Sequence, residues 1–163
     1  MTTGGDGSRS PAAERGRASS AGGSPHGAPI VAVGALVFDE HGRVLLVKRA
    51  QPPGAGLWSV PGGKLEGAET LAQAVAREVR EETGLTVEVG ALACVVERIG
   101  DDYHFVILDY LARVIGGTLA AASDVRAARF VSSDELAALP LTDGLVDVIV
   151  RARATHAAWS ASR

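Results

Sequence analysis

The segment from Thr70 to Gly84 constrains this chain more than any other, because it combines a helix with well-marked ends and three closely spaced glutamates. Thr70, followed three residues later by Gln73, has the form of a capping box, and Gly84 stands where a left-handed residue often ends a helix. These signals predict a helix from about Leu71 to Thr83. The apolar residues of this segment fall on one arc, which can pack against a sheet.

The three glutamates, Glu78, Glu81 and Glu82, occupy an adjoining arc of the same helix, about 100° wide at 100° per residue. We expect them at the edge of the packed face, partly shielded from water, where like charges repel more strongly than on an open surface. A divalent cation removes this repulsion, because Mg²⁺ takes carboxylate oxygens and shares its other positions with water and phosphates. A solvated acidic face, neutralised by Arg77 and Arg80, is the alternative that the helix alone leaves open.

Apolar and β-branched runs on both sides of this helix predict a sheet. The first two runs, Ile30 to Phe38 and Arg43 to Arg49, flank the turn "DEHG" and indicate a hairpin. We expect the next segment, rich in Pro and Gly, to be a loop as far as Gly63. Further strands are expected at about 86–99, 103–114 and 128–131, a small helix starting at "SSDEL", and an amphipathic helix at about 143–159. Strands interleaved with helices favour a mixed sheet covered on two faces.

The chain has 163 residues, enough for one hydrophobic core, which we place at residues 30–160 as a single domain. Residues 1–29 are nearly all Gly, Ser, Ala, Pro and Arg and are expected to form a disordered tail.

Composition limits the partners of this domain. The net charge of −3 gives no basic field for a nucleic acid polymer or an anionic membrane, and no apolar run reaches the length of a membrane span. The single cysteine, Cys94, rules out an internal disulfide and suits a reducing cytoplasm. Self-association as a homodimer is left open.

The segment "GKLEGAETLAQAVAREVREETGL", which begins at Gly63, resembles the signature of the Nudix hydrolases. Its fixed positions are Gly63, Glu69, Arg77, Glu78, Val79, Glu81, Glu82, Gly84 and Leu85. The flanking stretches "LLVKR", "GLWSVPGG" and "ARFVSSDELAALPL" are also similar to small bacterial members of the family, including those that resemble ADP-ribose pyrophosphatases. The resemblance covers roughly residues 30–150.

The resemblance implies an α/β/α sandwich with a mixed central β-sheet and a metal-dependent hydrolase. Its expected reaction is cleavage of the pyrophosphate bond in a small nucleotide, a nucleoside diphosphate linked to another group. An ADP-ribose-like substrate, giving AMP and ribose 5-phosphate, is favoured. In the family, the acids that match Glu78, Glu81 and Glu82 bind Mg²⁺ or Mn²⁺. The general base is left open among these acids and a later loop acid.

Other residues of the box receive supporting roles. We expect Arg77 to hold a box glutamate in its working orientation through a charged hydrogen bond, so it is counted with the catalytic set. Gly63 lets the backbone approach the cation, so that its carbonyl oxygen can be a metal ligand. Glu69, at the helix start, is expected to be mainly structural.

Outside the box, three residues are candidates for substrate binding. Arg49 ends a strand near the expected cleft and can hold a phosphate. Asp124 is placed near the nucleoside pocket, and His104, in "YHFVILDYL", is expected to line that pocket. Solvated surface positions are the alternative for Arg49 and Asp124, and an edge-strand position is the alternative for His104.

Four further expectations complete the sequence-based picture. Glu97 and Asp124 are both candidates for a loop carboxylate that acts as the base. Trp58 is expected to be buried, with stacking on a nucleobase as the alternative. Cys94 lies in an apolar strand and is expected in the core.

Two other functions use the same sequence features. A nucleoside triphosphate pyrophosphohydrolase that clears damaged or surplus nucleotides would need the same box, so the box does not separate it from the first function. A nucleotide-sensing regulatory module would often have lost box acids and gained a DNA-binding domain, whereas this chain keeps every acid and has no room for a winged helix.

Overall fold

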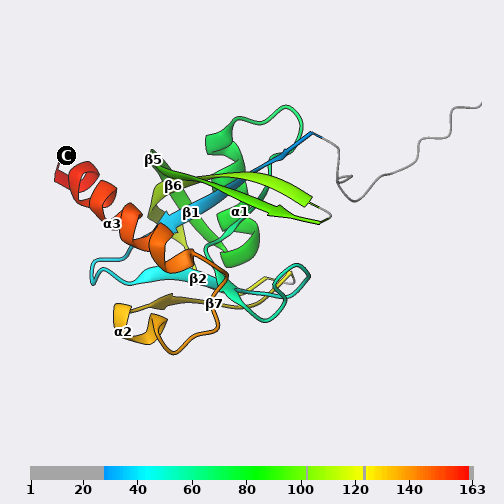
Figure 1. The fold of residues 1–163 in the computed structure, drawn as a ribbon. Helices are drawn as coiled ribbons and strands as arrows, with labels where there is room; N and C mark the ends of the chain where they lie inside the picture. Colours follow the sequence, from blue (N-terminus) through cyan, green and yellow to red (C-terminus); the bar gives the residue numbers. More distant parts are fainter. Residues whose placement is uncertain (1–27, 102, 123, 162–163) are drawn as a thin grey trace, which may run out of the picture.

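The computed structural model describes residues 28–101, 103–122 and 124–161 (Figure 1), and the predicted tail therefore lies almost wholly outside the described residues. The elements follow one another in the order β1 (Ile30–Val37), β2 (Val44–Arg49), β3 (Trp58–Ser59), β4 (Gly62–Lys64), α1 (Leu71–Thr83), β5 (Leu85–Gly100), β6 (Tyr103–Gly117), β7 (Val125–Val131), α2 (Ser133–Leu136) and α3 (Leu145–Ala161).

The strands form two sheets. A mixed sheet has the order β4-β1-β6-β5, in which β1 runs parallel to β6 and the other pairs are antiparallel. A smaller antiparallel sheet has the order β3-β2-β7. The predicted α/β fold with a mixed sheet is therefore confirmed.

The predicted hairpin between the first two strands is wrong. β1 and β2 belong to different sheets and are joined only by a bridge between Phe38 and Val44. The turn itself forms, because the Asp39 carboxylate accepts hydrogen bonds from the backbone N–H groups of His41 and Arg43. Beyond the turn the strands separate, since β1 pairs with β6 and β4 instead.

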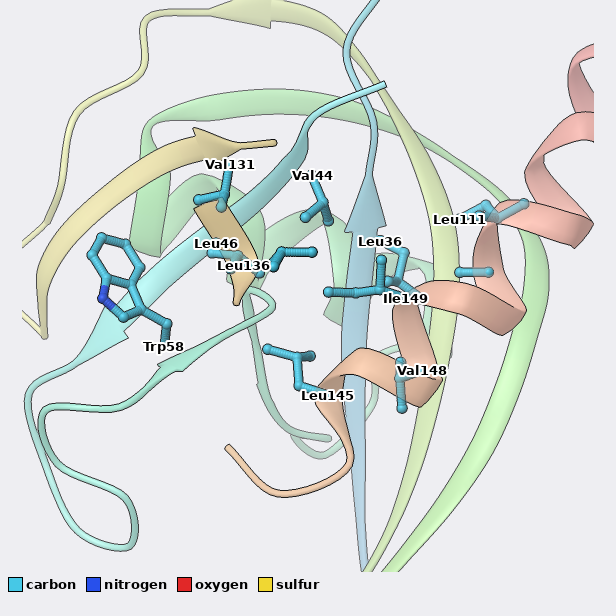
Figure 2. Close-up of a cluster of buried hydrophobic side chains, with 11 residues drawn as sticks. Leu36, Val44, Leu46, Trp58, Leu111, Val131, Leu136, Leu145, Val148 and Ile149 are labelled. Carbon is cyan, nitrogen blue, oxygen red and sulfur yellow. The ribbon is translucent and has the colours of Figure 1, made fainter. Parts of the chain in front are cut away.

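β1 is buried on both faces, which explains its nearly continuous apolar sequence. Val33 and Val37 lie in a core cluster with Val75 and Val79 of α1. The neighbouring Leu36 lies in a second cluster with residues of α3, and Figure 2 shows its side chain against Ile149. The mixed sheet is therefore covered by α1 on one face and by α3 on the other.

The helix predicted at 71–83 is confirmed with the same ends. The Thr70 hydroxyl accepts from the Gln73 N–H, and the Gln73 side chain accepts from the Thr70 N–H, which completes the capping box. Gly84 ends the helix with φ 70°, in the left-handed region. Ser132 and Glu135 form a second capping box at α2, where the small helix was predicted.

Other boundaries differ modestly from the prediction. The short strands β3 and β4 lie inside the segment expected to be a loop, and β7 begins three residues earlier than expected. Among the described residues, no helix has the length and apolar character needed to cross a membrane.

Candidate active site

Arg77 lies at the centre of the acidic cluster on α1. Its guanidinium donates to both carboxylate oxygens of Glu69, at 2.7 and 3.0 Å, and to Oε1 of Glu78 at 2.8 Å. It also reaches Oε2 of Glu81 at 3.3 Å and the carbonyl oxygen of Lys64 at 3.2 Å. Arg77 therefore links the helix start, β4 and two of the three box acids.

Hydrogen bonding and burial shift the pKa values of these acids in opposite directions. Hydrogen bonds from Arg77, with help from the Glu66 backbone N–H, lower the pKa of Glu69 to about 2. Burial raises the pKa of Glu78, although Arg77 opposes this shift. Burial, with a contribution from the nearby charge of Glu78, raises the pKa of Glu82 to about 8. The repulsion expected at the edge of the packed helix face therefore acts on Glu78 and Glu82.

The third box acid differs from the expectation of partial shielding. The side chain of Glu81 is 53% exposed, against 13% for Glu78. Glu81 lies a turn of the helix beyond Arg77, on the side that faces solvent. Its carboxylate therefore lies nearer to solvent than the half-buried carboxylates of Glu78 and Glu82.

The backbone of β4 passes directly beside the half-buried acids. The Gly62 N–H donates to Oε2 of Glu82 at 3.0 Å. A Cβ on Gly63 would overlap the Glu78 carboxylate, so a larger residue would push this side chain out of its present position. Gly63 and the half-buried glutamates therefore lie side by side.

The donors in this region suit a hard divalent cation, which takes carboxylate and backbone carbonyl oxygens. Two carboxylates whose ionised forms are disfavoured by burial and by each other gain most from a bound positive charge. Across residues 28–101, 103–122 and 124–161, however, no three His, Cys, Asp or Glu side chains are already gathered in metal-binding geometry. The Glu78 carboxylate is held by its hydrogen bond from Arg77.

A cavity of about 510 Å³ begins at this glycine edge and extends across the mixed sheet. Its floor is formed by β1, β6 and β5, and its far wall by the segment before α3 and the start of α3. Residues from each part are Gly63, Gly34, Asp109, Arg98, Thr142 and Leu145. The cavity thus runs from the glycine edge, which borders the acids, to a largely apolar compartment on the α3 side of the sheet.

Two of the three predicted substrate-binding residues lie near the acids. Arg49 lines the cavity, and its Nε donates to the Pro53 carbonyl oxygen at 2.8 Å. Its positive charge favours the ionised form of Glu82. Asp124 is close enough to Glu78 and Glu82 for its negative charge to raise the pKa of both.

The third residue predicted to bind substrate, His104, does not line this cavity. Strand alternation turns Tyr103, Phe105 and Ile107 toward the cavity, so His104 faces the opposite side of β6. There its Nε2 lies 3.1 Å from Oε1 of Glu97. Glu97 is exposed on the same side and is therefore not placed to act as the base.

Of the remaining two expectations, the burial of Trp58 is confirmed, whereas Cys94 is only partly buried. The Trp58 side chain is buried, with 7% of its surface exposed, and the Arg129 guanidinium lies 5.3 Å from its ring centre. Cys94 packs at the margin of a core cluster.

The sequence reasoning missed four charged residues of the cavity, Lys64, Arg98, Asp109 and Asp143. Lys64 directly follows the glycine pair, and its ammonium lies 5.9 Å from the centre of the Phe105 ring. Arg98 donates to the Asp143 carbonyl oxygen at the far wall. Asp109 had a visible signal, because it is a lone acid within the apolar run "FVILDYLA".

Comparison with known proteins agrees with this geometry. The family model for the NUDIX domain matches residues 28–151. The ADP-ribose pyrophosphatase of Methanocaldococcus jannaschii is 36% identical over 110 residues, which cover 66% of this chain and 64% of that relative's length. A putative 8-oxo-dGTP diphosphatase 2 of Mycobacterium tuberculosis is 41% identical over 112 residues, covering 66% of this chain and 75% of that protein.

A solved structure shows the same fold. The MutT NUDIX hydrolase from Burkholderia pseudomallei superposes with a TM-score of 0.70 at 34% identity, covering 76% of this chain and 98% of that one. The family match spans most of the chain and contains the helix, the glycine edge and the acids described above. The chain belongs to the Nudix family.

Proposed function

We propose that this protein hydrolyses the pyrophosphate bond of a nucleoside diphosphate linked to another group, with Mg²⁺ or Mn²⁺ as cofactor. The favoured substrate is ADP-ribose or a close analogue, with AMP and ribose 5-phosphate as products. The observation that carries the proposal is the half-buried pair Glu78 and Glu82, held beside the Gly62–Gly63 edge at the mouth of the cavity.

The acids are suited to hold the cofactor. Glu78, Glu81 and Glu82 supply carboxylate oxygens, and Gly63 supplies a carbonyl oxygen. A bound divalent cation would stabilise the negative charge that develops on the attacking and departing oxygens of the pyrophosphate. Arg77 positions Glu78 and Glu81 through its hydrogen bonds.

The proton of the attacking water needs an acceptor near these acids. The negative charge of Asp124 raises the pKa of both Glu78 and Glu82, so these three carboxylates lie near one another. Asp124 lies in the turn before β7 and is exposed, so a water molecule can reach its carboxylate. The base is therefore sought among these three residues.

The cavity has groups for both parts of the substrate. Arg49 and Lys64 line it near the glycine edge, where their positive charges can hold phosphate oxygens. The α3 side is lined by Val96, Leu145 and Val148, which suit a nucleobase and sugar. This arrangement of positive and apolar side chains favours one orientation of the substrate, with its phosphates at the acids and its base at the far wall.

The main alternative is hydrolysis of nucleoside triphosphates, for which the acids would be used in the same way. It is supported by the likeness to the mycobacterial relative, named as an 8-oxo-dGTP diphosphatase. ADP-ribose is supported by the likeness to the archaeal relative, named as an ADP-ribose pyrophosphatase. A purely nucleotide-sensing role is less well supported, because every box acid is retained.

Purified protein should be assayed with ADP-ribose, other nucleoside diphosphate derivatives and deoxynucleoside triphosphates, with Mg²⁺ and with Mn²⁺. Products are separated by chromatography, and kcat/KM is compared across the panel. We expect ADP-ribose or a related compound to be cleaved best. If a deoxynucleoside triphosphate is turned over more than ~10-fold more efficiently, equivalent to about 1.4 kcal/mol in transition-state binding, the alternative is correct. Absence of turnover with every nucleotide would reject both.

A further inference from the structure

Asp109 is a buried carboxylate that the proposed chemistry does not use. It lies on β6, in the floor of the cavity, and only 3% of its surface is exposed. It is one of two polar residues in the buried core of the described chain, and the other, Thr83, is satisfied within its own helix. A buried carboxylate is costly unless strong donors surround it.

The donors around Asp109 are weak. Within the part of the chain that the structure describes, its carboxylate accepts one hydrogen bond, from the Cys94 thiol at 3.8 Å. Arg98 contributes a favourable charge, but its guanidinium donates to the Asp143 carbonyl oxygen. The carboxylate therefore has unused acceptor capacity that faces the cavity.

The place of Asp109 relative to the acids is fixed by strand register. Gly34 pairs with Asp109 of β6 on one side and with Gly62 of β4 on the other, so the three residues form one row across the sheet. Two strand spacings place the Asp109 backbone ~10 Å from that of Gly62, whose N–H holds Glu82. This separation leaves room for a sugar between a phosphate at the acids and a base at Asp109.

The side chain also points in a defined direction. A Cβ on Gly34 would overlap Oδ1 of Asp109, so the carboxylate leans over β1 toward β4. Glycine at position 34 keeps this space open. Phe105, four residues earlier on the same face of β6, adds an aromatic wall to the same compartment.

We propose that Asp109 is a specificity-determining residue that accepts a hydrogen bond from an amino group of the substrate's nucleobase. The inference rests on the proposed function, since it assumes that a nucleotide occupies the cavity with its phosphates at the acids. Asp109 stands across the sheet from the acids and therefore selects the base without taking part in the cleavage.

The chemistry predicts which bases are preferred. An ionised carboxylate only accepts hydrogen bonds, so the exocyclic amino group of adenine or cytosine satisfies it. Hypoxanthine and uracil carry a carbonyl oxygen at the same position, which would place lone pairs against the carboxylate and leave it without that donor. Burial raises the pKa of Asp109 to about 6, so the acceptor form still prevails at neutral pH.

The test compares pairs of substrates that differ at this position. ADP-ribose is compared with its hypoxanthine counterpart, and CTP with UTP, using wild type, Asp109→Asn and Asp109→Ala. We expect wild type to favour the amino base by at least ~10-fold in kcat/KM, about 1.4 kcal/mol. The preference should fall within ~3-fold of unity in both variants, mainly through KM. An Asp134→Asn variant makes the same chemical change on the exposed surface of α2 and should keep the wild-type preference.

Binding gives a second readout without metal. Calorimetry with AMP and IMP in the presence of a chelator should show tighter binding of AMP to wild type and similar affinities in the Asp109→Asn variant. Turnover with an unchanged amino preference in both Asp109 variants would overturn this inference and leave the proposed function intact. Absence of turnover with any nucleotide, together with no AMP binding, would instead reject the proposed function itself.

Discussion

In the absence of metal, the Asp109→Asn variant should gain stability relative to wild type as the pH rises from acid to neutral. Burial raises the pKa of Asp109 from its ordinary value of 3.8 to about 6 in the folded protein. At 1.36 kcal/mol per pH unit, this difference of about 2.2 units corresponds to about 3 kcal/mol. The whole of this energy opposes folding once the pH is above 6.

The sign follows from proton binding. Below pH 3.8 both the folded and the unfolded chain carry the proton, so Asp109 contributes nothing. Between pH 3.8 and 6 the unfolded chain releases the proton while the folded chain keeps it, and the free energy of unfolding falls as the pH rises. Between pH 4 and pH 7 the loss attributable to Asp109 is about 2 kcal/mol. A variant without this carboxyl group should not show this fall in the free energy of unfolding.

Urea unfolding followed by tryptophan fluorescence measures this difference. The unfolding free energies of wild type and Asp109→Asn are determined from pH 4 to pH 7 with a chelator present. With a slope of about 2 kcal/mol per M, the gap between the two midpoints should change by about 1 M over this range. Other titrating groups are common to both proteins and cancel in the comparison.

Asp109→Ala provides the control, because it removes the same titration but also side-chain packing. Its offset from wild type will differ from that of Asp109→Asn, whereas its dependence on pH should be the same. Parallel curves for wild type and both variants between pH 4 and pH 7 would refute the argument that burial raises this pKa.

The other predictions concern the acids and their supports. Glu81→Gln or Glu82→Gln should lower turnover by at least ~100-fold and reduce the rise in melting temperature caused by Mg²⁺; near-wild-type turnover in both would contradict the assignment. Gly63→Ala should lower activity and Mg²⁺-induced stabilisation together, because the added methyl group overlaps the Glu78 carboxylate; unchanged kinetics would show that the close approach is dispensable. Arg77→Lys should keep the positive charge but lower kcat, since an ammonium cannot donate to both Glu69 oxygens and Glu78 in the same planar arrangement. Values of kcat and KM equal to those of wild type would argue against a positioning role.

The parts of the fold that sequence predicts well are those with local causes. The ends of α1 depend on Thr70, Gln73 and Gly84, which act within one turn of the helix, so their spacing is sufficient. The turn at Asp39 is also local and forms as expected. Whether the strands beside that turn then pair is a non-local matter, decided by the competing partners β6 and β4, and this is why the hairpin prediction failed.

The acids of the site were predictable for the same reason, since a single helix presents Glu78, Glu81 and Glu82. The cavity was not, because β6 is apolar on both faces, and alternation alone does not say which face meets the cavity. His104 and Asp109 differ by an odd number of residues and therefore lie on opposite faces. Sequence reasoning placed His104 toward the substrate, whereas Asp109 is the residue of this pair that faces the cavity.

The same physical condition recurs at both ends of the cavity. Glu78 and Glu82 at the mouth, and Asp109 in the floor, are carboxylates whose ionised forms are disfavoured by burial. Each lies against a glycine, Gly62 or Gly63 for the acids and Gly34 for Asp109, so the backbone is close and no side chain fills the space. Such sites lower the stability of the empty protein and gain the most from a ligand that supplies positive charge or N–H donors. Under the proposed function, a nucleotide bound with a divalent cation would supply both, with the cation at the acids and the amino group of the base at Asp109, so one ligand would relieve both sources of instability.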